Sequence, residues 1–386
     1  MTARNLKNER MAPMKEVTPF YRAMDDPAAS GRNITHKKIL GTLCSYAPEE
    51  LIYAAGYHPM RLFSSKADNH LAQNHLQTYC CSVVRGILED SLAGRLDFLH
   101  GTVFVHTCDS MQRLSDIWRL KGRYPFFTDV ILPAKMHAPS AQTYMAAVLE
   151  RCKTDLETDT GRPVTTQALA DAIRIYNRIR KNLARIYALK SRYPAALQNK
   201  DLLALVKGSM VMDRQAAADH LDKVILRLAS AVPDTKDAPK TPFKRLLLSG
   251  SVCDMPGLYD LFQETGAAVV GDDLCTGRRW FDGLIPEDME PMAAITRRYA
   301  QRLVCPAKHQ DLHTRAQQLI DQARQVAADG VVFVLLKFCD PHAFDYPHLK
   351  TCLDDAGIKS LVLELDDSQD SQGQLATRIE TFIHMI

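Results

Sequence analysis

Short apolar runs alternate with amphipathic segments along most of the chain from residue 39 onward. Two of these runs, TVFVHT at residues 102–107 and FFTDVIL at residues 126–132, have the length and the β-branched or aromatic content of buried strands. The last third contains four more such runs, at residues 245–249, 267–271, 331–336 and 360–365. Strands that alternate with helices in this way predict parallel sheets with crossover helices.

Apolar residues at helical spacing lie between these strands. The pattern predicts helices at residues 48–55, 82–92, 111–120, 256–264, 314–328, 347–356 and 374–385, with a turn and a further strand at residues 56–63. The middle of the chain differs, because residues 140–231 contain long amphipathic stretches such as 166–190 and no convincing strand. Three prolines and several charges at residues 232–244 have the composition of a linker.

We therefore predict an α/β fold with two parallel-sheet domains, the second of them doubly wound, and a helical region between them. The predicted parts are an N-terminal arm at residues 1–37, a first α/β domain at 38–139, a helical region at 140–235 and a second α/β domain at 236–386. The arm is polar and broken by prolines, so we expect at most one short helix and no chemistry in it.

Composition narrows the class of protein. A hydrophobic fraction of 46% and a charged fraction of 24% are those of an ordinary globular protein. The net charge of +3 is too small and too evenly spread to indicate nucleic-acid binding. Because the chain lacks a signal-like N-terminus and a long apolar run, we expect a cytoplasmic protein with no membrane span. Its ten cysteines are then free thiols, available for metal or redox chemistry.

The positions of the cysteines carry more information than their number. Four of them lie at or just beyond the carboxyl ends of predicted strands: Cys108, Cys253, Cys275 and Cys339. In open α/β sheets that edge is where ligands bind. Cys44 precedes a predicted helix and Cys81 begins one, where backbone N–H groups and the helix dipole stabilise a thiolate. All six are candidates to face one cleft.

Two interpretations of these cysteines stay open on spacing alone. They lack Cys-x-x-Cys spacing, so a zinc ribbon, a ferredoxin loop or a thioredoxin motif is unsupported, and metal ligands would have to converge from distant segments. Alternatively, each is simply a small buried apolar residue. We assign the remaining four to structure: Cys80, Cys152, Cys305 and Cys352.

Several longer motifs resemble one family. They are GTLCSYAPEELIYAAGYHPMRL at residues 41–62, YCCSVVRGILEDSLAG at 79–94, HTCDSMQRLSDIW at 106–118, SGSVCDMPGLYDLFQETGAAVVGDDLCTGRRWF at 249–281 and LLKFCDPHAFDYPHLK at 335–350. These segments resemble the subunits of 2-hydroxyacyl-CoA dehydratases and benzoyl-CoA reductases, of the 2-hydroxyglutaryl-CoA dehydratase D-component type. The resemblance extends over nearly all of the chain after residue 37.

The resemblance implies two Rossmann-like (flavodoxin-like) domains and a helical region, with a [4Fe–4S] cluster between the two domains. It implies Cys81, Cys108 and Cys339 as ligands, with Cys44 next, and one iron left open. Similar enzymes deliver one low-potential electron to an acyl-CoA thioester, and the resulting ketyl radical allows a hydroxyl group to leave or a ring to be reduced. The partners implied are a homologous second subunit and a separate ATP-hydrolysing iron–sulfur activator, since this chain has no phosphate-binding loop of its own.

The resemblance leaves two alternatives. A set of six cysteines also resembles the homodimeric double-cubane proteins, which reduce small molecules at an [8Fe–9S] cluster; here it would consist of Cys44, Cys81, Cys108, Cys253, Cys275 and Cys339. Cys253 is slightly out of register with that branch. The other alternative is a non-catalytic electron-transfer subunit whose active site belongs to a partner.

Two other residues are candidates for catalysis. Ser45, beside Cys44, is a candidate to position substrate or to donate a hydrogen bond to a cluster sulfur. His342, three residues after Cys339, is a candidate proton donor. The pair Arg278 and Arg279 is a candidate for binding CoA phosphates, although paired arginines on a loop are commonly only solvated.

Overall fold

The computed structural model describes residues 14–65, 70–136, 138–232, 242–302, 305–308, 311–366 and 372–386. Its strands form two four-stranded sheets in which every strand pair is parallel. The first sheet contains β1 (Ile39–Thr42), β2 (His58–Arg61), β3 (Gly101–Val105) and β4 (Phe126–Val130). The second contains β5 (Lys244–Gly250), β6 (Ala267–Asp273), β7 (Gly330–Leu336) and β8 (Lys359–Leu365). The predicted fold class is confirmed.

The two sheets have the same topology. The strand order is β2-β1-β3-β4 in the first sheet and β6-β5-β7-β8 in the second. In each sheet the chain moves outward from the first strand and then crosses to its other side, so the direction of winding reverses between β1 and β3 and between β5 and β7. In sheets of this kind ligands bind beyond the carboxyl ends of the strands at that reversal.

Helices connect the strands and join the two sheets. The first half contains α3 (Glu49–Ala54), α4 (Ser82–Leu92) and α5 (Asp109–Lys121), with the 3-10 turn η3 (Ala72–Asn74) before α4. The middle contains α6 (Ala141–Thr160), α7 (Thr166–Arg192), η4 (Pro194–Ala196), α8 (Asn199–Val211) and α9 (Arg214–Ala231). The last part contains α10 (Pro256–Glu264), α11 (Arg278–Phe281), α12 (Pro291–Gln301), α13 (Leu312–Gln325), α14 (Asp340–Asp355) and α15 (Gln372–Met385). Within the described residues, no helix combines the length and the apolar character needed to cross a membrane.

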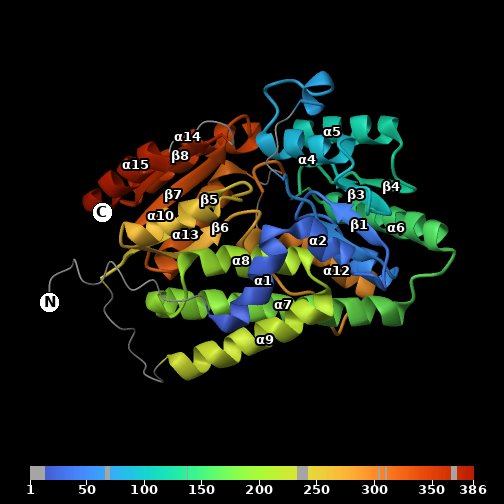
Figure 1. Cartoon of the computed structure of the whole chain (residues 1–386), viewed down its shortest axis with the longest axis horizontal. Helices are drawn as coiled ribbons and strands as arrows, with labels where there is room; N and C mark the ends of the chain where they lie inside the picture. Colours follow the sequence, from blue (N-terminus) through green and yellow to red (C-terminus); the bar gives the residue numbers. More distant parts are fainter. Residues whose placement is uncertain are drawn as a thin grey trace.

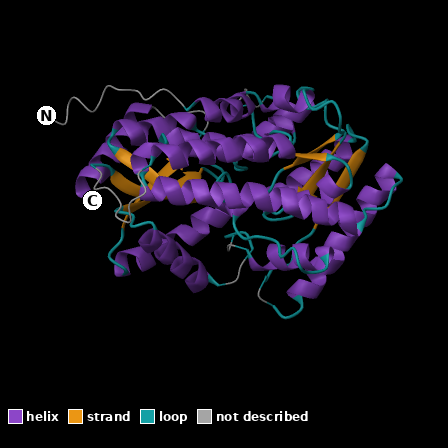
Figure 2. Ribbon diagram, turned by 90° about the horizontal axis from the view of Figure 1, so that it is seen from below, coloured by secondary structure: helices purple, strands orange, loops and turns teal. Residues whose placement is uncertain are grey.

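The middle helices hold the two sheets together. Figure 2 shows the sheets at opposite ends of the molecule with long helices running between them. The longest, α7, contacts α3 of the first half and also β6 and α11 of the second. Helix α8 is buried along nearly its whole length, between β2 on one side and α10 on the other. Helix α6 packs on β4 of the first sheet, and α12 packs on α6, so these helices join parts that the sequence divides (Figure 1). The predicted boundaries between the parts stay predictions.

The N-terminal segment is more ordered than the sequence indicates. Residues 14–32, expected as part of an arm, form the 3-10 turn η2 (Lys15–Val17) and the helices α1 (Thr18–Asp25) and α2 (Pro27–Arg32). Helix α1 packs on α8, and the side chain of Phe20 is fully buried there. Gly208 of α8 permits this approach, because a Cβ at that position would lie 2.8 Å from the backbone of Phe20.

Two elements differ from their prediction for physical reasons. Strand β1 is absent from the predicted strands, because its four residues ILGT are too few to form a recognisable apolar run. Helix α14 begins at Asp340, seven residues before the predicted start at Pro347. Proline is favoured in the first turn of a helix, which makes Pro347 a plausible start from sequence. The chain instead places Pro341 in the first turn and carries Pro347 inside the helix.

A buried carboxylate ties the two halves and the helical region together. Glu49, at the start of α3, accepts hydrogen bonds from Tyr176 Oη (2.9 Å) and Arg214 Nη2 (3.0 Å) of the middle helices. Its other oxygen accepts from Trp280 Nε1 of α11 (2.9 Å). All four side chains are buried. Glu49 therefore fixes the loop that carries Cys44 against both other parts of the molecule.

We expect Glu49→Gln to lower the free energy of unfolding by about 3–5 kcal/mol, because it leaves the buried guanidinium of Arg214 without its carboxylate. Urea unfolding followed by circular dichroism measures this change. The matched control is Glu150→Gln, which removes an exposed carboxylate paired with Lys153 on α6 and should change the stability by less than about 0.5 kcal/mol. Equal stability of the two variants would contradict the role of Glu49.

Candidate functional site

Cysteines from both α/β domains converge beyond the carboxyl ends of the strands. Cys108 lies three residues after the end of β3, and Cys339 lies three residues after the end of β7. Burial is the main cause of the raised pKa of Cys339, and the nearby sulfurs of Cys81 and Cys108 raise it further. Since Cys81 and Cys108 come from the first half of the chain and Cys339 from the second, the carboxyl edges of the two sheets meet here.

Each of these three cysteines is the N-cap residue of a helix. Cys81 precedes α4, Cys108 precedes α5 and Cys339 precedes α14. Backbone N–H groups of the first turn lower the pKa of the thiol, those of Val84 for Cys81 and of Met111 for Cys108. Such groups, together with the helix dipole, stabilise a thiolate. The prediction that Cys81 begins a helix is confirmed.

Burial nevertheless outweighs these N–H groups. It raises the pKa of Cys108 to about 12, and the neighbouring sulfurs of Cys81 and Cys44 act in the same direction. It also raises the pKa of Cys81. Buried thiols that raise one another's pKa stay protonated unless a positive charge joins them, whereas a metal ion deprotonates a coordinating thiol outright. The arrangement therefore suits a bound metal group better than free thiolates.

Three further cysteines adjoin the first three. Burial raises the pKa of Cys305 to about 12, with Cys275 and Cys44 nearby raising it further. The sulfurs of Cys44 and Cys108 interact, so the two sets are contiguous. Lys308 lies beside them, and although burial lowers its pKa, the negative charge of Cys305 and Cys44 acts against this. We refer to the whole set as the six-cysteine group: Cys44, Cys81, Cys108, Cys275, Cys305 and Cys339.

Cys305 is the member of this group that sequence reasoning missed. It follows a helix and not a predicted strand, and on that ground the sequence assigns it to structure. Cys305 lies in the long connection between β6 and α13. This connection contains α12, which packs on α6 beside the first sheet (Figure 1). There Cys305 and Cys44 pack against the same apolar core. Nothing in the local sequence signals this contact, because it depends on how two distant segments fold together.

Cys253, the remaining predicted ligand, is fully buried and lies against Tyr259. Its thiol is in hydrogen-bonding contact with the hydroxyl of Tyr259 on α10. Its backbone N–H and carbonyl oxygen both bond to Thr276 Oγ1, at 3.1 and 2.9 Å. The structure therefore brings five of the six predicted ligands together with Cys305 and directs Cys253 to Tyr259.

The two predicted catalytic residues are both buried. Ser45 lies in the loop between β1 and α3, where its carbonyl oxygen accepts a hydrogen bond from Arg302. His342 lies in the first turn of α14, and burial, aided by the nearby cations of Arg279 and Arg315, holds its pKa well below the ordinary value. Its Nε2 is 3.3 Å from Arg279 Nη1, so the neutral ring accepts from the guanidinium. Proton donation by His342 stays a prediction, as does the role of Ser45.

The arginine pair is divided by the fold. Arg279 is 2% exposed and binds both carboxylate oxygens of Asp273 at 2.7 Å, so it is not available to a phosphate. Arg278 is partly exposed and pairs with Asp282 at 3.2 Å. Neither contact indicates a CoA site.

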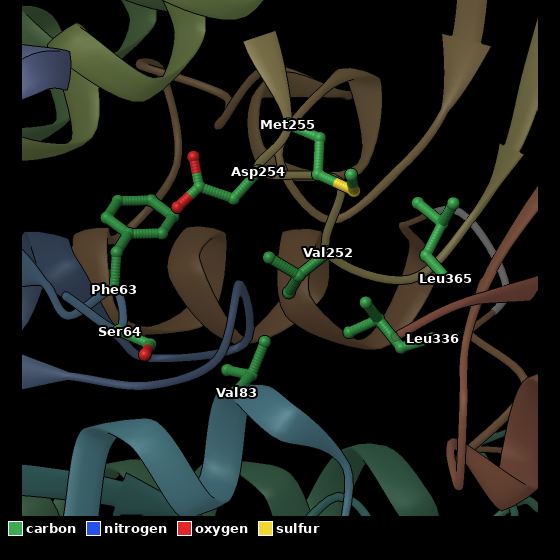
Figure 3. Close-up of a pocket in the computed structure, with 8 residues that line it drawn as sticks. All are labelled: Phe63, Ser64, Val83, Val252, Asp254, Met255, Leu336 and Leu365. Carbon is green, nitrogen blue, oxygen red and sulfur yellow. The ribbon is translucent and has the colours of Figure 1, made fainter. Parts of the chain in front are cut away.

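A small cavity lies between the two domains near these cysteines. Figure 3 shows Phe63, Ser64 and Val83 of the first half facing Val252, Met255 and Leu336 of the second, with Asp254 and Leu365 completing the lining. Val83 follows Cys81 by two residues and Leu336 precedes Cys339 by three. The cavity volume is about 20 Å³, which is room for about one water molecule. An acyl chain does not fit there in this conformation.

Comparison with known proteins gives the chain its family. A family model described as 2-hydroxyglutaryl-CoA dehydratase, D-component, matches residues 44–386. The chain belongs to this family. The match begins at Cys44 and includes every member of the six-cysteine group, so the resemblance of the sequence motifs is confirmed.

Curated relatives of this D-component family match nearly end to end. The chain is 28% identical to the (R)-phenyllactyl-CoA dehydratase beta subunit of Clostridium sporogenes, over 90% of this chain and 91% of that protein. It is 27% identical to the beta subunit of lactoyl-CoA dehydratase from Anaerotignum propionicum, over 95% of both chains. It is also 28% identical to one of the subunits of benzoyl-CoA reductase from Thauera aromatica, over 81% of both chains.

The residue before Cys339 has an unusual backbone conformation. Phe338 has a φ of 63°, in the left-handed region, although it is not a glycine, and its side chain is 39% exposed. This conformation costs a non-glycine residue about 1–2 kcal/mol. The strained turn directs the chain from β7 into α14, and it thereby sets the position of Cys339.

We expect Phe338→Gly to raise the free energy of unfolding by about 1 kcal/mol, because glycine adopts this conformation without strain. The matched control is Phe344→Gly, which removes an exposed aromatic residue inside α14 and should lower stability by about 0.5–1 kcal/mol through helix propensity. Urea unfolding distinguishes the two signs. A destabilised Phe338→Gly protein would show that the turn is not strained.

Proposed function

We propose that this chain is the iron–sulfur subunit of an enzyme that dehydrates or reduces an acyl-CoA thioester, with a [4Fe–4S] cluster held by Cys81, Cys108 and Cys339. The observation that carries the proposal is the convergence of three helix N-cap cysteines from both α/β domains. Cys44 and Cys275 adjoin these three and are the next candidates for ligands.

The donor set fits such a cluster. Thiolates are the ligands that iron–sulfur clusters take, and each thiolate binds a different iron, so the sulfurs need not converge on one point. Within the residues that the structure describes, no three His, Cys, Asp or Glu side chains are arranged to hold a single metal ion. Thiols from both domains, with the pKa values of Cys81, Cys108 and Cys339 raised by burial, suit a cationic group that several thiolates share.

When bound, the cluster would supply one electron of low potential to the thioester carbonyl of the substrate. The chain's own residues hold the ligands and keep water out. At Cys81 and Cys108 the first-turn N–H groups lower the pKa of the thiol, which favours the thiolates, and such groups near a sulfur tune the potential of a cluster. The narrow cavity lined by Val83 and Leu336 admits about one water molecule, which supports a site shielded from solvent.

The partners follow from the names of the relatives and from the family resemblance. The dehydratase chains from Clostridium sporogenes and Anaerotignum propionicum are named as beta subunits, which supports a second subunit for this chain. We propose a homologous partner and a separate ATP-hydrolysing iron–sulfur protein as the electron donor. The donor is required because the electron must be delivered at a potential below that of ordinary carriers.

A second candidate is an electron-relay role, in which the partner binds the acyl-CoA. The two candidates differ in where substrate binds. Adding an acyl-CoA to the isolated, reduced chain changes the electron paramagnetic resonance spectrum of the cluster only if the substrate binds here.

The homodimeric alternative with an [8Fe–9S] cluster stays a proposal as well. It requires six thiolates, and the structure provides six adjoining cysteines when Cys305 takes the place of Cys253. Iron and sulfide analysis of protein purified without oxygen distinguishes the alternatives. About four irons per chain supports the single cube, and about eight supports the double cubane.

The ligand assignment predicts the effect of single substitutions. We expect Cys81→Ser, Cys108→Ser and Cys339→Ser each to lose most of the bound iron, because each removes one of three protein ligands. Cys152→Ser is the matched control, since Cys152 is a buried cysteine in the core beside α6 and should leave the iron content unchanged. Circular dichroism confirms that the variants are folded. Full iron content in all three ligand variants would refute the proposed cluster.

A further inference from the structure

Arg279 is a buried cation aimed at one of the six cysteines. Its Nη1 donates to Cys275 Sγ at 3.7 Å and to the carbonyl oxygen of Gly250, at the end of β5, at 2.9 Å. The same nitrogen lies 3.3 Å from His342 Nε2. Its Nε and Nη2 bind the two carboxylate oxygens of Asp273, at the end of β6, each at 2.7 Å. The guanidinium thus joins two strand ends and the first turn of α14 to Cys275.

The partners of Arg279 are themselves fixed. Asp273 also accepts from Arg315 Nη2 at 3.2 Å and from Ser249 Oγ at 3.2 Å. Arg315 in turn binds Asp345 of α14 at 2.7 Å. A planar guanidinium held by a bidentate carboxylate has little freedom to turn. The direction of Nη1 toward Cys275 is therefore set by the network and not by Cys275 itself.

The backbone on either side of the contact is constrained too. Gly250 brings its carbonyl oxygen within reach of Arg279 because β5 runs close to β7, where a Cβ on Gly250 would lie 1.9 Å from Val334 O. The backbone N–H of Cys275 donates to Ser251 O at 2.8 Å, which ties the cysteine to the loop after β5. Cys275 is thus held from its backbone and from its sulfur at once.

We propose that Arg279 is a positioning residue of the cluster site: it fixes the Cys275 thiolate among the ligands beside Cys339, and its N–H bond to that sulfur raises the reduction potential of the iron–sulfur group. The inference rests on the proposed function and extends it, because it needs the cluster and also needs Cys275 as a ligand in addition to Cys81, Cys108 and Cys339. A hydrogen bond to a ligating sulfur withdraws electron density from it and favours the reduced state.

The test compares Arg279→Gln with Arg279→Lys in anaerobically purified protein with its cluster. Gln removes the positive charge and the paired N–H donors of the guanidinium, so we expect the midpoint potential to become more negative. A redox titration followed by electron paramagnetic resonance measures this potential. Lys keeps the charge without the paired donors and should fall between the Gln variant and the unchanged protein. Arg278→Gln, next along the chain and partly exposed, is the matched control and should leave the potential unchanged.

A second variant keeps the test decisive if Arg279→Gln does not fold. Cys275→Ala removes the sulfur that accepts the bond and leaves the pairing of Arg279 with Asp273 in place, and it should also shift the potential. In the Cys275→Ala protein, adding Arg279→Gln should produce no further shift, because the two residues act through one contact.

The outcomes separate this inference from the proposed function. If Arg279→Gln and Cys275→Ala both keep the iron content and the midpoint potential of the unchanged protein, the inference is wrong while the cluster stands. If the unchanged protein, purified without oxygen, holds no iron, the proposed function fails first. Additive shifts from the two substitutions would also overturn the inference, since they would act by separate routes.

Discussion

The rest of the molecule depends on how the two parallel sheets are held with their carboxyl edges together. That relation is set by a buried carboxylate, Glu49, which joins α3 to the middle helices and to α11. Glu50, the next residue, is equally buried. Burial alone raises the pKa of a carboxyl, but the cations of Arg180 and Arg298 hold the pKa of Glu50 below its ordinary value. Two adjacent carboxylates from one short helix thus bind cations and hydroxyls of other segments, and the loop with Cys44 is fixed as a consequence.

The repeated topology explains why the cysteines can meet. In both sheets the third strand lies beside the first, and a cysteine three residues beyond that third strand caps the following helix: Cys108 after β3 and Cys339 after β7. The two residues therefore occupy equivalent positions in the two domains. Each sheet contributes one of these cysteines from its carboxyl edge, at the point where the winding reverses. Sheets of this kind bind ligands at that point, so two such binding positions meet at one interface.

The sequence predicts the helices and strands and the location of the site better than it predicts which residues make up the site. Apolar runs and strand-end cysteines are local signals, so they predict seven of the eight described strands and the sheet edge that carries Cys108 and Cys339, while Cys81 is predicted from its place at a helix start. Strand β1 is not predicted, because its four residues are too few to form a recognisable apolar run. Cys305 and Arg279 could not be placed near the other cysteines from sequence, because their positions come from the segment between β6 and α13 and from a buried pairing with Asp273. Contacts of that kind depend on the three-dimensional arrangement and leave no pattern along the chain.

Two opposing electrostatic effects act on the thiols of the six-cysteine group, and the proposed cluster would reconcile them. Burial raises the pKa values of Cys81, Cys108, Cys305 and Cys339, whereas first-turn N–H groups at Cys81 and Cys108 and the N–H of Arg279 at Cys275 favour thiolates. The favourable groups do not suffice by themselves, because burial remains the larger effect at Cys108 and Cys339. The two effects are compatible if the positive charge of a metal group supplies most of the stabilisation of the thiolates. The N–H groups of the protein would then supply the smaller part, which orients the sulfurs.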